Sequence, residues 1–277
     1  MLELTEKITI PDYAINLMNY CDRFLTEIEN IYKEVYFSSG KYVIEDKETI
    51  ECLRNLKNEE EINEYLEKQG YLEEHYIKKT FVCLLQDFCL YMGESMCMVK
   101  KYKPQIAYTL ARKPLIDDIH YLCKLLVDPK NAVEIILNSE AKDKEFNCED
   151  DKKVFEEAGT ILGEEISQCL HNFRYENDGV NIKTSCDRAS HIVTKNNSIK
   201  TNKGELNFVF MTTEGIQEWC YYYCRQVSFV LLLSLKLVEE LYAKILEKRN
   251  KDFNFDSVMD EFMNYYQSML EKESNEE

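Results

Sequence analysis

Residues 71–102 read YLEEHYIKKTFVCLLQDFCLYMGESMCMVKKY, and this stretch decides the class of fold. It is dense in large apolar side chains, and Pro104 marks its end. The pattern predicts one long central helix in which the methionines fill gaps of the core. The apolar residues that define it are Phe81, Leu84, Leu85, Phe88, Leu90, Met92, Met96 and Met98.

The segments on either side of this stretch also favour helices. Proline suits a first turn and aspartate caps free amides, so a long helix is expected to begin near Pro11 and Asp12. A helix carrying apolar residues between positions 106 and 126 is expected to be kinked or restarted at Pro114. Further helices are predicted at about 47–56, 58–69 (ending at Gly70), 154–170, 213–248 and 253–270.

One region does not have a helical pattern. Residues 174–212 contain the β-rich stretch HIVT (191–194) and the alternating stretch ELNFVFM (205–211). These stretches predict a small β-hairpin inserted around residues 190–211. The fold class predicted is therefore mainly α, a bundle-like arrangement of many helices with one hairpin.

The chain is expected to form a single domain over residues 1–277. A polar stretch, NSEAKDKEFNCEDD, follows residue 137 and offers one point of subdivision. It would separate an N-terminal helical half, 1–138, from a C-terminal half, 149–277, that carries the hairpin.

Composition restricts the cellular setting. Eleven cysteines are scattered without a C-x-x-C pair, as expected of small buried side chains in a reducing cytosol and not of a zinc site. The N-terminus lacks the basic and apolar regions of a secretory signal. The most apolar stretch, 227–237, is shorter than the roughly 20 residues that cross a bilayer. We therefore expect a cytoplasmic protein with no metal and no membrane partner.

The charge of the chain is unevenly distributed. Its formal net charge is −17. Residues 100–113 contain five basic residues and no acid, and residues 179–204 carry a net charge of +4, so the other 237 residues carry −26. If these two basic segments fold together, they form a local positive site able to hold a phosphate group. If they fold apart, they are solvated lysines and arginines.

Three of the four histidines lie in or beside the two basic segments: His120, His171 and His191. Histidine transfers protons near neutral pH, and arginine or lysine stabilises charge on a phosphate, so these residue types fit a metal-independent ribonuclease. The predicted catalytic residues are these three histidines. The predicted phosphate-binding residues are Arg112, Lys113, Arg174 and Arg188. The alternative is structural, with histidines that cap helix ends and an Asp187–Arg188 ion pair.

The helical body with Arg, His and Asn at helix ends loosely resembles the HEPN ribonuclease-toxin and defence domains. In that family an Arg and a His separated by four to six residues form a site across a dimer. Here His120 lies eight positions after Arg112, and His191 lies three positions after Arg188, so the R-x4-6-H motif is absent. The resemblance covers helical character and transfers no catalytic assignment.

Two functional hypotheses follow from the sequence. The first is a phosphate-directed or nucleic-acid-directed protein, most concretely a metal-independent ribonuclease of the toxin or antiviral-defence type, with RNA or a nucleotide bound at the basic site. The second is a non-catalytic acidic module that binds a protein partner, inhibits one, or forms a homodimer. No cofactor is expected, because the sequence lacks a Gly-rich phosphate loop, a Rossmann fingerprint, G-x-S-x-G and H-E-x-x-H.

Overall fold

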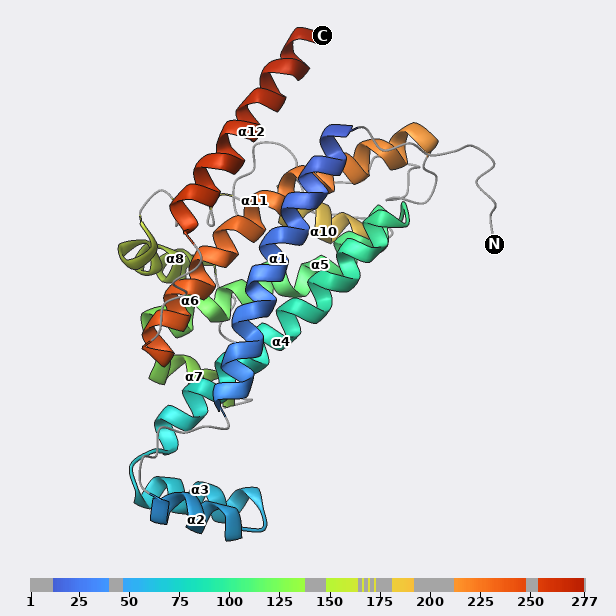
Figure 1. Cartoon of the computed structure of the whole chain (residues 1–277). Coiled ribbons are helices and arrows are strands. Elements are labelled where there is room, and N and C mark those ends of the chain that lie inside the picture. Colours follow the sequence, from blue (N-terminus) through green and yellow to red (C-terminus); the bar gives the residue numbers. More distant parts are fainter. Residues whose placement is uncertain are drawn as a thin grey trace.

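A computed structural model describes residues 12–39, 47–137, 148–163, 181–191, 212–247 and 254–276, together with Ile166, Cys169 and Asn172. Every element in these ranges is a helix (Figure 1). In chain order they are α1 (Asp12–Ser39), α2 (Lys47–Asn55), α3 (Glu59–Lys68), α4 (Leu72–Lys100), α5 (Pro104–Arg112), the π-helix η1 (Lys113–Asp118), α6 (Ile119–Val127), α7 (Pro129–Leu137), α8 (Cys148–Leu162), α10 (Ile182–Ser190), α11 (Thr213–Leu246) and α12 (Phe255–Glu276).

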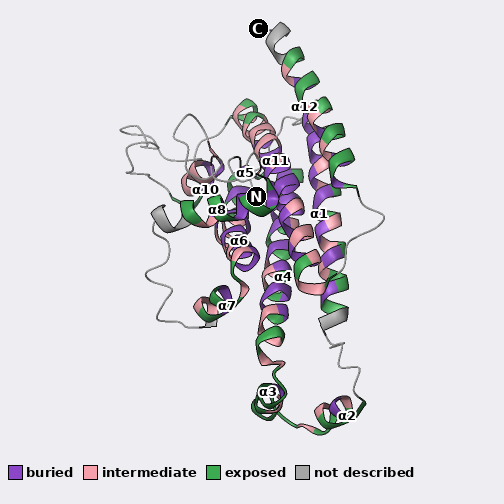
Figure 2. Cartoon of the chain, turned by 90° about the vertical axis from the view of Figure 1, so that its left-hand side faces the viewer, coloured by how far each residue is buried: buried purple, intermediate pink, exposed green. Residues whose placement is uncertain are grey.

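Helix α11 forms the centre of the bundle because its sequence is apolar on nearly every side. Between Val227 and Leu241 most side chains are buried, including four consecutive residues from Val230 to Leu233. A helix that is hydrophobic all round must be covered by other elements. Figure 2 shows buried residues along α1, α4 and α11, which lie beside one another.

Helix α1 lies along α11 and runs in the same direction. Tyr13 stacks edge-on against Tyr221, with the ring centroids 5.0 Å apart. Nearly a turn of α11 further on, the Cys21 thiol lies 3.9 Å from the carbonyl oxygen of Cys224. Near the other end of both helices, the Tyr242 hydroxyl donates to Glu34. The positions rise together along both helices, so the contact is parallel.

Helices α4 and α5 form a tight hairpin that packs against α11. The chain reverses at Tyr102, which adopts the left-handed conformation with φ +58°. Ser95 of α4 is fully buried, and its hydroxyl donates to the carbonyl oxygen of Ala107, 2.6 Å away. The same hydroxyl bonds the buried Tyr223 hydroxyl of α11. One serine therefore joins three helices at the core.

Helix α12 covers the other side of the α1–α11 pair through aromatic packing. Phe262 is fully buried and stacks edge-on against Tyr20 and Phe24 of α1 and against Phe229 of α11. At the edge of this contact, Arg23 and Glu261 form an ion pair at 2.9 Å. Helices α2 and α3 lie at one end of the bundle, beyond the start of α4 (Figure 1).

The prediction of a mainly helical bundle is confirmed, but the predicted hairpin around residues 190–211 is wrong. The described residues contain no strand, and the segment expected to lead into the hairpin is helix α10, which ends at Ser190. Its start is fixed by Asn181, whose side chain accepts a hydrogen bond from the Thr184 amide at 2.7 Å. This N-cap stabilises the start of the helix, although the apolar pattern of the segment indicates a helix only weakly. Residues 192–211 lie outside the described residues.

Helix α4 is the one described helix long and apolar enough, by length and composition, to cross a membrane. Nearly half of its most apolar window is buried inside the bundle. The buried part of the window packs against neighbouring helices, among them α1 and α5, whereas Leu90 and Tyr91 of α4 are exposed.

The buried Ser95 gives a stability prediction. We expect Ser95→Ala to lower the free energy of unfolding by about 1–3 kcal/mol, because the Tyr223 hydroxyl is left buried without this partner. Adding Tyr223→Phe removes the stranded hydroxyl, so the double variant should lose less than the sum of the two single variants. Urea unfolding of all four proteins measures this cycle. Strict additivity would show that the two hydroxyls do not interact.

Candidate functional site

The first basic segment ends in a π-helix. Helix α5 continues without interruption into η1, and the amide of Ile119 bonds the carbonyl oxygen of Pro114, five residues back. Proline lacks an amide hydrogen and clashes with the carbonyl of the preceding turn, and a wider turn relieves that clash. The irregularity predicted at Pro114 is therefore present. Its effect is to change the direction of the side chains that follow Arg112.

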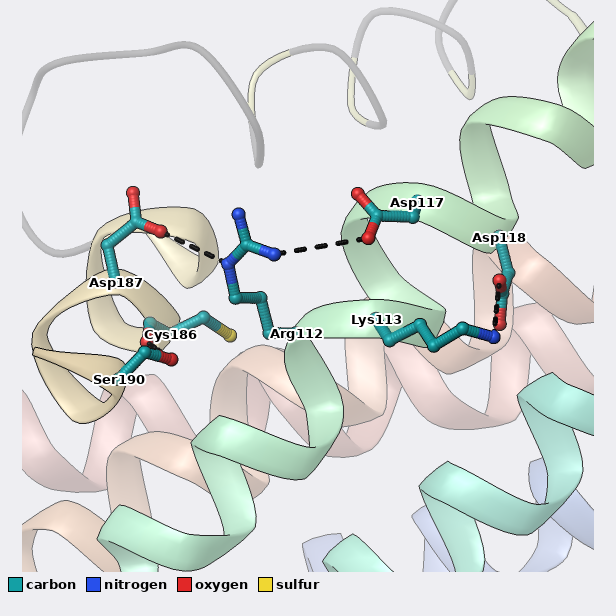
Figure 3. Close-up of polar contacts among 7 residues, drawn as sticks. All are labelled: Arg112, Lys113, Asp117, Asp118, Cys186, Asp187 and Ser190. Atoms are coloured by element: carbon teal, nitrogen blue, oxygen red, sulfur yellow. Dashed lines mark hydrogen bonds and ion pairs between the residues drawn. The ribbon is translucent and has the colours of Figure 1, made fainter. Parts of the chain in front are cut away.

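The two basic segments meet where α10 packs on α5. The Arg112 guanidinium, at the end of α5, donates through Nε to Oδ1 of Asp187 on α10 at 3.4 Å (Figure 3). Its Nη1 lies 3.9 Å from Oδ2 of Asp117 in η1. The Arg112 side chain remains 44% exposed, so solvent reaches the guanidinium between the two carboxylates. Residues 75 positions apart thus share one surface site.

Lys113 points to the opposite side of the junction. Its ammonium group forms ion pairs with Asp87 of α4 and with Oδ1 of Asp118, the latter at 3.5 Å. It also lies over the ring of Tyr91, 5.0 Å from the centroid. These contacts bind Lys113 to α4 and to the end of η1, so its charge stabilises the junction between the helices.

Asp118 is the most perturbed acid of the described site. Its side chain is only 4% exposed, and Oδ2 has no hydrogen-bond partner among the described residues. Burial raises its pKa from 3.8 to about 7, and the neighbouring carboxylates Asp87 and Asp117 add to the increase, whereas Lys113 opposes it. Asp118 was not predicted from the sequence as a site residue. The indication available in the sequence was Pro114, a proline inside a helical pattern, followed closely by the acidic pair Asp117–Asp118.

The cations of this junction are matched by acids from other parts of the chain. Four carboxyl groups, those of Asp87, Asp117, Asp118 and Asp187, surround Arg112 and Lys113. These four acids lie outside residues 100–113, on three other elements, so they do not enter the positive charge of that segment. The site is therefore a network of alternating charge rather than a purely positive surface.

The structure separates the predicted site residues. His120 is fully buried on α6, with its ring 6.3 Å from the ring of Phe155. His191 is exposed and ends α10, one turn after Asp187, and Arg188 is half-buried on the same helix. His171 and Arg174 lie outside the described residues. Arg112 is thus brought to the α5–α10 contact through Asp187, Arg188 and His191 lie on α10 and at its end, and His120 lies in the core.

The chemistry available at the α5–α10 contact is proton transfer and anion binding. A guanidinium held between two carboxylates is oriented but exposed, and an exposed imidazole lies at the end of the neighbouring helix. No group of three His, Cys, Asp or Glu side chains within the described part of the chain is arranged to hold a metal ion. Comparison with known proteins gives no match to a family model, a curated sequence or a solved structure.

The raised pKa of Asp118 predicts a pH-dependent effect of Asp118→Asn. The folded protein binds this proton more tightly than the unfolded chain, so the carboxyl group is neutral and well accommodated below about pH 4. Its stabilising effect is lost as the pH rises through about 7. The asparagine variant should match the parent near pH 4 and be more stable at pH 8, by up to about 4 kcal/mol for a pKa raised from 3.8 to about 7.

Thermal unfolding of parent and variant across this pH range measures the difference. Asp260→Asn is the control, since Asp260 is an exposed aspartate of α12 and is not one of the groups that shift the pKa of Asp118. A constant difference between Asp118→Asn and the parent from pH 4 to pH 8 would contradict the assignment.

Proposed function

We propose that the protein is directed to phosphate groups and cleaves RNA without a metal, with its site at the contact of α5 and α10. One observation carries the proposal: Arg112 of the first basic segment contacts Asp187 of the second, one turn before His191. In this proposal Arg112 and Arg188 bind the phosphate and His191 transfers the proton. Lys113 holds the junction, and His171 and Arg174 remain candidates outside the described residues.

The contacts of Arg112 with its two carboxylates are weak enough for a phosphate to replace one of them. Its two carboxylate distances, 3.4 and 3.9 Å, exceed the roughly 2.7–2.9 Å of a strong charged hydrogen bond. A phosphate that offers two oxygens to the planar guanidinium forms shorter bonds and can displace Asp117 or Asp187. Until then the carboxylates keep the guanidinium in place. His120 is left out of the proposed site because its side chain is fully buried.

The test is cleavage of a fluorogenic RNA oligonucleotide in the presence of EDTA. We expect His191→Ala to reduce the rate by about 100-fold or more, as the loss of a general acid or base does. Arg112→Ala should weaken both binding and cleavage, and Arg112→Lys should recover part of the loss because it restores the charge but not the planar fork. Full activity of His191→Ala, or no cleavage by the parent protein, would remove the proposal.

Two control variants keep this experiment specific. Arg23→Ala removes an arginine that is 43% exposed and also ion-paired to a carboxylate, on α1. His75→Ala removes a partly buried histidine on α4. Neither residue lies on α5, η1 or α10, so both variants should cleave RNA at the parent rate.

A non-catalytic acidic interaction module is the second candidate. The observation that favours it is the matching of Arg112 and Lys113 by four carboxyl groups, which leaves little positive potential in a chain of net charge −17. In this case the parent protein shows no RNA cleavage and forms a complex with a protein partner, or a homodimer, that persists after ribonuclease treatment. Sedimentation of the purified protein and of its complexes separates the two candidates.

A further inference from the structure

A pocket on α11 lies outside the Arg112 site. It measures about 490 Å³ and is lined on one side by a stripe of α11 and closed on another by Tyr266 of α12. The stripe follows helical spacing: Glu218 is exposed, and Trp219, Tyr222, Arg225, Gln226 and Phe229 are half-buried. A volume of this size accepts a small organic ligand.

The aromatic walls of the pocket favour a planar ligand. Trp219, Tyr222 and Phe229 of α11 line it together with Tyr266. Trp219 is held from behind by the fully buried Tyr108 of α5, edge-on at 5.9 Å. Trp219 and Tyr222 meet at 65° with their centroids 6.1 Å apart, so they present two differently oriented aromatic surfaces. Any planar aromatic ring can stack on such surfaces, whatever its substituents.

Two polar side chains of the pocket are held in position, and the charged side chains among its described lining residues sum to no net charge. Gln226 accepts hydrogen bonds at Oε1 from the Tyr108 hydroxyl at 2.9 Å and from the Ser185 hydroxyl at 3.4 Å. Arg225 donates through Nε to the Tyr266 hydroxyl at 2.9 Å. With Glu218, the lining offers one carboxylate, one guanidinium and one amide. Held donors and acceptors lower the entropic cost of binding.

We propose that this pocket binds a nucleobase, stacked on Trp219 and Tyr222 with its hydrogen-bonding edge toward Glu218, Arg225 and Gln226. The balanced charge of the lining fits an uncharged ring better than a phosphate alone or an organic cation. The aromatic walls and the alternating donors and acceptors match the face and the edge of a base. The base can come from a free nucleotide or from an RNA chain. The inference goes beyond the proposed cleavage and does not require it.

Trp219 is the single tryptophan of the chain, so its fluorescence reports directly on the pocket. The experiment titrates the full-length protein with the four nucleosides, their 5′-monophosphates, a tetranucleotide RNA and ribose 5-phosphate. Free tryptophan at the same absorbance corrects for light absorbed by the bases. We expect saturable quenching by at least one base-containing probe and none by ribose 5-phosphate.

Variants and controls make the outcome decisive. Tyr222→Ala should weaken binding about tenfold, the loss expected when one stacking surface is removed, and Tyr222→Phe should retain it. Gln226→Ala should change which base binds best. Tyr36→Ala is the matched control, since it removes an aromatic ring that is 54% exposed near the C-terminal end of α1, outside the pocket lining. Circular dichroism of each variant confirms that it is folded.

The arms of the titration separate the sources of the base. Quenching by nucleosides or mononucleotides assigns the pocket to a free ligand, and quenching by the tetranucleotide alone assigns it to RNA; both support a base-binding pocket. Quenching by ribose 5-phosphate equal to that by the nucleotides, quenching insensitive to Tyr222→Ala, or no quenching by any probe overturns the inference. Because no cleavage is measured, its failure is distinct from that of the proposed ribonuclease.

Discussion

The burial of α11 is the constraint on which the other helices depend. Nearly every side chain of α11 from Val227 to Leu235 is buried, so this part of the helix is stable only where other helices cover it, and each fully buried Leu or Val contributes about 1.5–3 kcal/mol. Helix α1 lies along it in parallel, the α4–α5 hairpin packs across it, and α6, α8 and α12 cover further sides. The order of the helices around α11 therefore determines which segments distant in the sequence become neighbours.

Both sites described above follow from the way α5 packs on this central helix. Tyr108 of α5 is fully buried, stacks on Tyr223 at 5.1 Å and donates to Gln226. One turn later α5 ends at Arg112, which the same packing places against α10. Tyr108 thus supports the back of the aromatic pocket and fixes the helix that carries the guanidinium.

The electrostatics of the α5–α10 contact are local. The strongly negative net charge of the chain does not describe it, and neither does the positive charge of residues 100–113 taken alone. Arg112 and Lys113 each contact two carboxyl groups, and Asp118 is buried so deeply that its pKa rises to about 7. Desolvation exceeds the attraction of Lys113 at this position, because the attraction is shared with Asp87 at a partly exposed site.

The sequence by itself determined the helical class, the long helices 72–100 and 213–246, and the irregularity at Pro114, because apolar periodicity and proline act within a few residues. It also identified the two basic segments. The start of α10 at the N-cap Asn181 is a local feature that the sequence pattern did not reveal. Only the tertiary structure decided that His120 is buried while His191 is exposed, and that carboxylates from α4, η1 and α10 surround Arg112 and Lys113. Helix packing determines burial and ion pairing between distant residues, and a linear pattern does not record which helices pack together.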